Sequence, residues 1–335
     1  MRFKKILSLI AASATCAALL ASCGGGGETS TADGGKVYNI GVLQYADHPS
    51  LDNCREGFKQ GLDSEGIKYE ITEQSAKNDD ATNTQIAQQF ASKKMDLVCG
   101  IATPSAQACY NACFDANIPV IFNAVSDPVA AKLAESDTKP MAGISGISDK
   151  LPVDTQLQLI REMLPDAKKI GILYTTSEAN SVSTIEDYKA KVGEYGFELV
   201  EKGITNAADI PQAVDLLVSE VDCITNMTDN TVVNNLPVLL EKATAAKIPV
   251  FGSEEEQVGN GCIASAGIDY LELGKKAGVM AARVLKGEDI NTMPYETMTE
   301  SKITINPDAA AAVGVEIPQS ITDRAEVKTA PSEQS

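Results

Sequence analysis

The sequence predicts an α/β protein made of two similar lobes, each with a parallel sheet covered by helices. Three observations lead to this fold class. Short apolar segments alternate with amphipathic segments of about 10 to 15 residues, which is the pattern of βαβ units. Short motifs recur at a spacing of 130 residues along the chain. The length of 335 residues corresponds to roughly two domains of about 150 residues each.

The internal repeat runs through most of the chain. The segments that match at an offset of 130 are 40–43 (IGVL) with 170–173 (IGIL), 66–67 (GI) with 196–197 (GF), and 118–121 (IPVI) with 248–251 (IPVF). A fourth match, of 96–98 with 222–224, has an offset of 126 and indicates one small length change. Four matches in the same order predict two copies of one structural unit.

Strands and helices alternate regularly in the first half. The first helix is predicted from apolar residues at helical spacing, which are Leu51, Cys54, Phe58 and Leu62. In chain order we expect a strand at 38–44, a helix at 50–65, a strand at 69–72, a helix at 82–93, a strand at 97–101, a helix at 105–115 and a strand at 119–123.

The second half repeats this order from 170 to 251. Before it, residues 157–164 predict a helix, and Pro152 suits a helix start. After it we expect a strand at 265–268, a helix from about 271 to 285 with Asp269 as its N-cap, a strand at 302–305, a short helix at 307–313 and a polar tail at 322–335.

The charge balance excludes several classes of function. Lys and Arg number 28 against 46 Asp and Glu, so the net charge is −18, and loss of residues 1–22 would bring it to −21. Such an acidic surface repels phosphate backbones, so we expect no nucleic-acid partner. The single histidine, His48, excludes a His-rich metal site. We expect no metal and no cofactor.

The N-terminus has the features of an export signal. Residues 1–22 combine an early basic region with an apolar region at 6–20. The following Leu-Ala-Ser-Cys segment resembles a bacterial lipobox and predicts lipidation at Cys23, with a plain signal peptide as the alternative. Residues 23–36 are rich in Gly, Ser and Thr and predict a flexible tether. We therefore expect a lipid-anchored protein at the outer face of the cytoplasmic membrane, extracellular or periplasmic.

Six cysteines follow Cys23, and their positions favour free thiols over a disulfide framework. Cys99 and Cys223 lie in apolar segments that predict strands, where a buried cysteine packs as a small hydrophobic residue. Cys109 and Cys113 are four residues apart on a predicted helix, which is a poor geometry for a disulfide between them. The sequence leaves open whether any pair of the six forms a disulfide.

The ligand site is predicted in a cleft between the lobes. Ligands of open parallel sheets bind outside the carboxyl ends of the strands. The loops at these ends are 45–50, 102–105, 124–127, 175–181, 227–231 and 253–257, and none of them contains Lys or Arg. A phosphate or dicarboxylate would need a cation there. The loops therefore favour a small neutral or zwitterionic ligand.

These loops, together with the lipobox, resemble substrate-binding proteins of ABC transporters with the type I periplasmic-binding fold, in particular the tryptophan/tyrosine-type lipoproteins. The resemblance covers residues 37 to about 321. It is carried by 40–45 (IGVLQY), 48–52 (HPSLD), 100–107 (GIATPSAQ), 118–120 (IPV), 125–128 (VSDP), 174–181 (YTTSEANS), 228–231 (TDNT), 251–254 (FGSE) and 267–270 (GIDY).

The resemblance implies two Rossmann-like lobes that close about a hinge on a small ligand. The first lobe would be 37–147 plus 263–296, and the second 148–262 plus 297–321. An aromatic amino acid is the ligand that this family implies. The protein would act as a monomer and deliver the ligand to an ABC permease and its ATPase, both on separate chains.

Twelve residues of the cleft loops are candidate ligand contacts. They are Tyr45, His48, Thr103, Ser105, Ser126, Asp127, Asn180, Ser181, Asp229, Asn230, Ser253 and Asp269. Hydroxyls at Thr103 and Ser105, at a helix start, suit an α-carboxylate. Asp229 suits the α-ammonium, because a buried amine needs a counter-charge. The alternative for these residues is simple N-capping of helices.

Tyr45 and His48 could stack on an aromatic ligand. The alternative for His48 is an exposed loop residue. Glu254 is a candidate ligand contact together with Ser253, because the two repeat the position of residues 123–124 in the first half. The run Glu254 to Glu256 could also supply the paired carboxylates of an enzyme, but it is more simply a solvated helix start. Within the same fold, the ligand could be another amino acid, a nucleoside or a sugar, although no tryptophan is present to stack on a sugar ring. A sensory lipoprotein would have the same cleft. An enzyme is disfavoured, because only His48 and Ser50 form an adjacent candidate pair.

Overall fold

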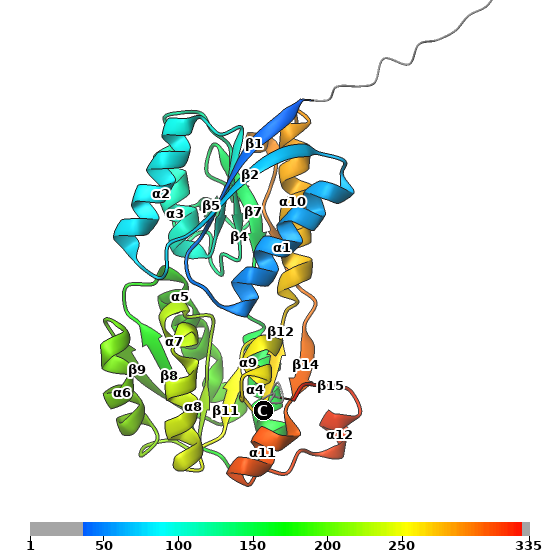
Figure 1. The fold of residues 1–335 in the computed structure, drawn as a ribbon. Coiled ribbons are helices and arrows are strands. Elements are labelled where there is room, and N and C mark those ends of the chain that lie inside the picture. Colours follow the sequence, from blue (N-terminus) through cyan, green and yellow to red (C-terminus); the bar gives the residue numbers. More distant parts are fainter. Residues whose placement is uncertain (1–35, 330–335) are drawn as a thin grey trace, which may run out of the picture. The chain divides into compact units, whose positions relative to one another are not determined.

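The computed structural model describes residues 36–329, which fold into two α/β lobes (Figure 1). Each lobe has a central sheet with helices packed on it, as the sequence predicts. The predicted leader, the lipidation site Cys23 and the tether up to residue 35 lie outside the described residues, as do residues 330–335 of the predicted tail.

The strands, in chain order, are β1 (Val37–Gln44), β2 (Lys68–Ser75), β3 (Leu97–Ile101), β4 (Val120–Asn123), β5 (Ala134–Ser136), β6 (Lys139–Pro140), β7 (Ile144–Ser148), β8 (Lys169–Thr175), β9 (Glu198–Ile204), β10 (Cys223–Thr225), β11 (Val250–Gly252), β12 (Ala264–Gly267), β13 (Glu296–Thr297), β14 (Lys302–Ile305) and β15 (Glu326–Val327). The α-helices are α1 (Pro49–Ser64), α2 (Asp80–Lys93), α3 (Thr103–Cys113), α4 (Val153–Met163), α5 (Ala179–Lys191), α6 (Ile210–Leu217), α7 (Asn230–Asn234), α8 (Leu236–Ala245), α9 (Glu255–Gly259), α10 (Tyr270–Leu285), α11 (Pro307–Val313) and α12 (Gln319–Thr322). Three 3₁₀ turns are η1 (Val192–Tyr195), η2 (Ala207–Asp209) and η3 (Ile290–Thr292).

The two large sheets share the order of their central parallel strands. The first has the order β13-β7-β4-β3-β1-β2, and the second β15-β14-β12-β11-β10-β8-β9. The parallel order β4-β3-β1-β2 in the first therefore corresponds to β11-β10-β8-β9 in the second. Ile40 of β1 pairs with Leu97, and its repeat partner Ile170 pairs with Cys223. The repeat and the predicted two-lobed α/β class are confirmed.

The central strands are continuous apolar segments because their residues are buried on both faces of the sheet. All five residues of β3 are buried, because helices cover both faces of the parallel sheet. One apolar core fills the first lobe and includes residues of α10, whereas the second lobe has separate cores on the two faces of its sheet. The cleft lies where the carboxyl ends of the two sets of strands face each other.

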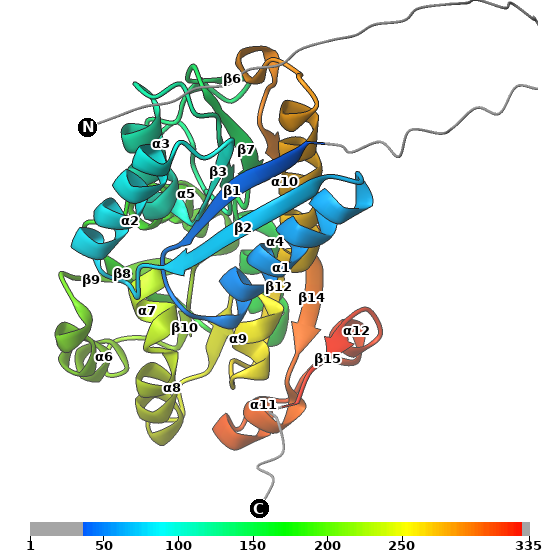
Figure 2. The same ribbon diagram turned by 45° about the horizontal axis from the view of Figure 1, so that its top comes forward.

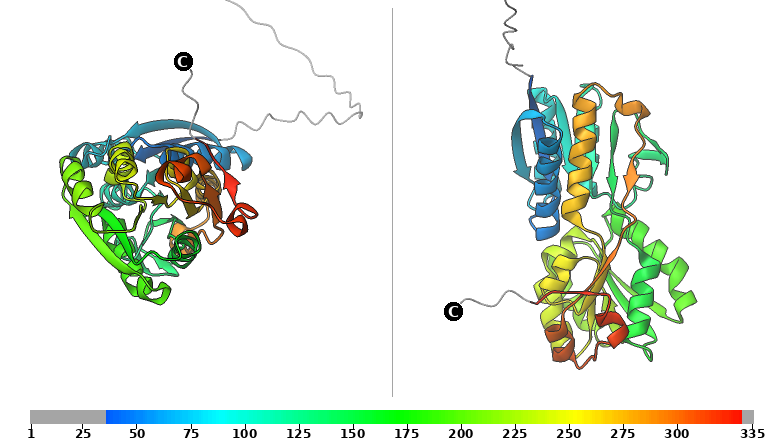
Figure 3. Two further views of the ribbon diagram at one scale, coloured as in Figure 1. Left: turned by 90° about the horizontal axis from the view of Figure 1, so that it is seen from below. Right: turned by 90° about the vertical axis from the view of Figure 1, so that its right-hand side faces the viewer.

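Helices α1 and α10 pack side by side at very short range in the first lobe (Figures 2 and 3). Two glycines on each helix make this possible. A Cβ atom added to Gly57 would lie 2.1 Å from the Leu271 carbonyl oxygen, and one added to Gly278 would lie 2.1 Å from the Phe58 carbonyl oxygen. The contact joins α1, whose N-cap is His48, to α10, which follows a crossover between the lobes.

The crossovers differ in one respect from the predicted division. The predicted first lobe included residues 263–296, but β12 pairs with β11 and β14 in the second sheet. The chain returns to the first lobe only near Ile268, which packs in its core. The start of the predicted polar tail is also too early, because β15 pairs with β14. An apolar strand shows in the sequence that it is buried, but not in which sheet it lies.

All six cysteines after Cys23 are buried free thiols. Cys109 and Cys113 lie on the same helix, α3, as the sequence predicts. Burial raises the pKa of each of these thiols, so they pack as small apolar residues and not as reactive groups.

Candidate functional site

A small pocket lies between the two lobes. It is lined by His48, Leu51, Ala102, Thr103, Ala124, Ser126, Asp149, Asn180, Thr228, Asn230, Val233, Glu254 and Tyr270. These residues come from both lobes and from the crossovers. None of them is a lysine or an arginine, whereas two are carboxylates.

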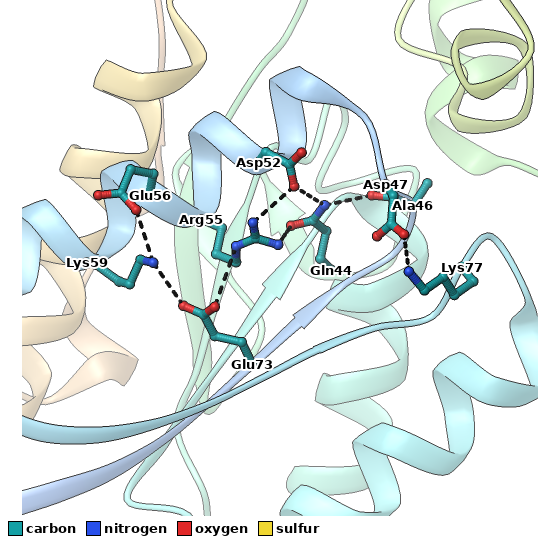
Figure 4. Close-up of polar contacts among 9 residues, drawn as sticks. All are labelled: Gln44, Ala46, Asp47, Asp52, Arg55, Glu56, Lys59, Glu73 and Lys77. Atoms are coloured by element: carbon teal, nitrogen blue, oxygen red, sulfur yellow. Dashed lines mark hydrogen bonds and ion pairs between the residues drawn. The ribbon is translucent and has the colours of Figure 1, made fainter.

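The loop that presents His48 is held from behind by a polar network (Figure 4). The amide of the buried Gln44 donates to the Ala46 carbonyl at 2.8 Å and to Asp52 at 3.0 Å. Arg55 donates to the Gln44 side-chain oxygen at 3.0 Å and contacts Asp52 at 3.2 Å. The loop conformation therefore depends on side chains of β1 and α1. The same surface continues through ion pairs among Arg55, Glu73, Lys59 and Glu56.

His48 lies in the cavity wall and is not the exposed loop residue of the alternative interpretation. Its Nδ1 atom is buried and has no hydrogen-bond partner. Burial lowers the pKa of His48 to about 4, so the imidazole is neutral at physiological pH. The Ser50 hydroxyl also has no partner, so the structure contains no hydrogen bond between these two residues.

The start of helix α3 forms a second part of the first-lobe wall. Ala102 has a φ of 73°, a left-handed conformation that is unusual for alanine, and it turns the chain into the helix. The buried Thr103 hydroxyl has no partner. Free N–H groups and the dipole at a helix start suit a carboxylate. Ala124, with a φ of 58°, and Ser126 continue the wall after β4.

The second-lobe wall is built on two buried carboxylates that do not reach the cavity. Asp229 caps α7 and accepts hydrogen bonds from Thr175, Ser181 and Val232. Glu178 accepts from Asn180 and Asn230, which line the cavity. Burial, followed by the charge of Asp229, raises the pKa of Glu178 to about 7.

Asp149 and Glu254 make one end of the cavity acidic. Asp149 accepts a hydrogen bond from the Tyr270 hydroxyl at 2.9 Å through Oδ2, while its buried Oδ1 has no partner. Burial raises the pKa of Asp149. Burial and the neighbouring Glu256 raise the pKa of Glu254 to about 8. A ligand cation placed here would meet an uncompensated acidic site.

The sequence interpretation of Glu254 as part of a solvated helix start is wrong. Its side chain is only 1% exposed and lines the cavity. Sequence analysis also missed Asp149 and Tyr270. Asp149 follows β7 at a crossover, outside the strand-end loops considered, and Tyr270 occupies the first position of α10 beside the capping residue. A lone buried carboxylate between two lobes has no sequence signature of its own.

Five of the twelve candidate residues line the cavity: His48, Thr103, Ser126, Asn180 and Asn230. The other seven lie behind or beside it: Tyr45, Ser105, Asp127, Ser181, Asp229, Ser253 and Asp269. Tyr45 donates to Asp80, and Ser105 donates to Asn83. Asp269 caps α10 by accepting a hydrogen bond from the Glu272 nitrogen, so it has the N-capping role that the sequence offered as the alternative to ligand contact.

Direct contacts join the two lobes around the cavity. Asn53 donates to Glu256 at 2.6 Å, and Asn78 donates to Thr231 at 3.3 Å. The hydroxyls of Ser126 and Thr228 are 3.4 Å apart. Ser183 also donates to Asp127. The lobes are therefore closed on the cavity from several sides.

The cavity offers both halves of a zwitterion site. Helix α3 and Thr103 supply hydrogen-bond donors, and Asp149 and Glu254 supply carboxyl groups that can accept from an ammonium group. Within residues 36–329, no group of three or more His, Cys, Asp or Glu side chains is placed to hold a metal ion.

Comparison with known proteins decides the family. Residues 39–328 match the family model described as ABC transporter substrate binding protein. The chain belongs to this family. Its members are binding proteins and not an enzyme class. No helix among the described residues is both long and apolar enough to cross a membrane.

The chain is also similar over most of its length to individual known proteins. A curated relative from Clostridioides difficile (strain R20291), named tyrosine-binding protein, is 41% identical over 329 residues, or 94% of each chain. A domain from Streptococcus pneumonia in complex with L-Trp is 33% identical, with a TM-score of 0.83 over 87% of this chain and 100% of the other. The ligand-free, open structure of a substrate binding protein with adhesive properties from Clostridium difficile is 40% identical, with a TM-score of 0.68 over 88% and 100%.

The TM-scores indicate the arrangement of the lobes. The open relative has the higher sequence identity but the lower TM-score, whereas the tryptophan-bound relative has the reverse. Similar lobes in a different relative orientation produce this combination. It agrees with the contacts across the cleft, and the structure of this substrate-binding protein is therefore a closed form.

Proposed function

We propose that this chain is the extracytoplasmic, lipid-anchored substrate-binding protein of an ABC importer and that it carries an aromatic amino acid. The observation that carries the ligand proposal is the closed cavity, with an unpartnered carboxylate oxygen at Asp149 and an unpartnered hydroxyl at Thr103. The names of the tyrosine-binding and tryptophan-bound relatives support the same ligand class. The lipobox at Cys23 supports the anchor.

In this proposal the two polar ends of the cavity bind the two charged groups of the amino acid. The α-ammonium lies at Asp149 Oδ1, with Glu254 beside it. The α-carboxylate lies at the start of α3 and accepts from Thr103. This replaces Asp229, whose carboxylate oxygens already accept bonds within the second lobe. A buried ammonium without such a counter-charge would cost several kcal/mol.

The remaining lining suits a flat side chain. Leu51 and Val233 are apolar, while His48 and Tyr270 contribute flat rings, and the neutral imidazole can pack without a charge to hydrate. A tyrosine hydroxyl or a tryptophan N–H needs a polar partner when buried. Asn180 Oδ1 and His48 Nδ1 are unpartnered acceptors for it.

The predicted cycle is closure of the lobes on the ligand, followed by delivery to a permease and an ATPase on separate chains. Ligand that contacts both lobes only in the closed form shifts the population toward it. The protein would act as a monomer, held at the outer face of the cytoplasmic membrane.

The test is calorimetric titration of the chain without its predicted leader against the twenty amino acids, common sugars and nucleosides. We expect tyrosine, tryptophan or phenylalanine to bind most tightly. Asp149→Asn should weaken that binding by about 100-fold, because the ammonium loses a buried counter-charge. Exclusive binding of a sugar or a nucleoside would contradict the amino-acid proposal and leave the family unaffected. Metabolic labelling with a fatty acid, with Cys23→Ser as the control, tests the anchor.

A further inference from the structure

Glu178 is a buried carboxylate that collects five hydrogen bonds without touching the cavity. It is 4% exposed and precedes α5. Its Oε2 accepts from the backbone and side-chain nitrogens of Asn230, at 3.1 and 2.6 Å, and from Asn180 at 3.2 Å. Its Oε1 accepts from the backbone nitrogen and the hydroxyl of Thr231, each at 3.2 Å. No cation accompanies it among these partners.

The three residues that Glu178 holds have two different tasks. Asn180 and Asn230 line the cavity. Thr231 faces the other lobe and accepts a hydrogen bond from Asn78 at 3.3 Å. One carboxylate therefore fixes, at the same time, the ligand-facing amides of the second lobe and a contact that exists only when the lobes are closed.

The Asn78 side of this contact is also tied to the cavity. Lys77 and Asn78 have φ values of 57° and 62°, a left-handed conformation in two consecutive non-glycine residues that must be held by its surroundings. The Asn78 nitrogen donates to the Tyr45 carbonyl at 2.8 Å, and Lys77 pairs with Asp47 (Figure 4). The loop that contacts the second lobe is thus bound to the loop that presents His48.

We propose that Glu178 is the positioning residue of the second lobe, which couples ligand contact at Asn180 and Asn230 to lobe closure at the Thr231–Asn78 contact. This inference rests on the proposed function, because it assigns regulation to the same cavity. Ligand that orders the two asparagines also orders Thr231 for the other lobe, and closure in turn orders the asparagines for the ligand.

A carboxylate is required because all five partners are donors. Ionised glutamate only accepts hydrogen bonds, whereas a glutamine has the same size but carries an NH₂ group in place of one oxygen. Glu178→Gln would therefore set donor against donor at Asn230 or at Thr231. The substitution leaves the shape of α5 unchanged and does not touch the ligand.

The experiment compares Glu178→Gln with Glu186→Gln, a matched change on the exposed face of α5, the helix that follows Glu178, at pH 8, where Glu178 is ionised. We expect Glu178→Gln to weaken binding of the preferred amino acid by about tenfold, chiefly through faster dissociation, and Glu186→Gln to leave it unchanged. Asn78→Ala should weaken binding in the wild-type background and have little further effect in the Glu178→Gln background. Additive effects of the two changes would overturn the coupling.

A second measurement needs no ligand. Amide hydrogen exchange at Asn230 and Thr231 should be slow in the wild-type chain and at least about tenfold faster in Glu178→Gln. Unchanged exchange at these two amides would overturn the positioning role, even if no amino acid bound. Failure of every amino acid to bind the wild-type chain would instead overturn the proposed function, while the exchange result would still decide the role of Glu178.

Discussion

The two walls of the cavity are equivalent in topology but are supported by different physical means. In the first lobe, the wall depends on backbone conformation at Ala102 and Ala124 and on a half-exposed network centred on Arg55. In the second lobe, it depends on buried carboxylates, Glu178 and Asp229, that are satisfied by hydrogen bonds from their neighbours.

This difference predicts where the protein is sensitive to charge. Exposed ion pairs contribute little, because water screens them and long side chains lose entropy when they pair. A buried carboxylate contributes through the donors that it satisfies, and its removal leaves those donors without partners. The first lobe should therefore tolerate the removal of a charged side chain, whereas the second lobe should not tolerate the removal of a buried acceptor.

The largest effect is expected from Asp229→Ala, which leaves buried donors at Thr175, Ser181 and Val232 without an acceptor. We expect the free energy of unfolding to fall by about 3 kcal/mol, measured by urea denaturation. The control is Asp79→Ala, which removes the exposed N-cap of α2 and should destabilise the protein much less. Equal losses in the two variants would show that the buried network adds nothing to capping.

A slightly smaller loss of stability is expected where helices α1 and α10 pack together in the first lobe. It tests whether the stability of this lobe depends on close packing instead of charge. Gly278→Ala places a Cβ against the backbone of α1 and should destabilise the protein by about 2 kcal/mol. Gly259→Ala is the matched helical control, since nothing lies within 4 Å of the added atom. It should be neutral or slightly stabilising. Thermal unfolding of both variants checks this, and a neutral Gly278→Ala would contradict the close packing of α1 and α10.

The buried acids of the second lobe predict an unusual dependence of stability on pH. The pKa is about 7 for Glu178 and about 8 for Glu254, both above the usual range, so their favourable contribution is present at low pH and is lost as pH rises through these values. We expect the ligand-free closed form to be more stable at pH 6 than at pH 8.5, by about 2 kcal/mol. Thermal unfolding measured across this pH range checks this. The melting temperature should depend less on pH in Glu254→Gln than in the wild-type chain.

The smallest effect is expected on the exposed side of the first lobe. Lys77→Met removes the ion pair with Asp47 and should change the free energy of unfolding by less than about 1 kcal/mol. The difference between the variant and the wild-type chain should become smaller in high salt, because salt screens the pair. Denaturation at two salt concentrations checks this. A loss as large as that of Asp229→Ala would remove the distinction between the two lobes.

The fold class and the region of the site can both be predicted from the sequence. The 130-residue repeat and the alternation of strands and helices predicted two parallel sheets, because burial on both faces requires continuous apolar strands. The same pattern predicted that strand-end loops meet in a cleft. His48, Thr103, Ser126, Asn180 and Asn230 lie on the cavity wall within these loops.

The role of each polar side chain depends on tertiary contacts that the sequence does not show. Asp229 and Glu254 both follow strands in the second half, yet the first caps a helix beneath the site and the second lines the cavity. Asp149 enters the site from a crossover, and β12 joins the second sheet although the division by sequence placed it in the first lobe. The physical reason is that local sequence sets period and capping, whereas the burial of a carboxylate and its partners depend on residues brought together from both lobes.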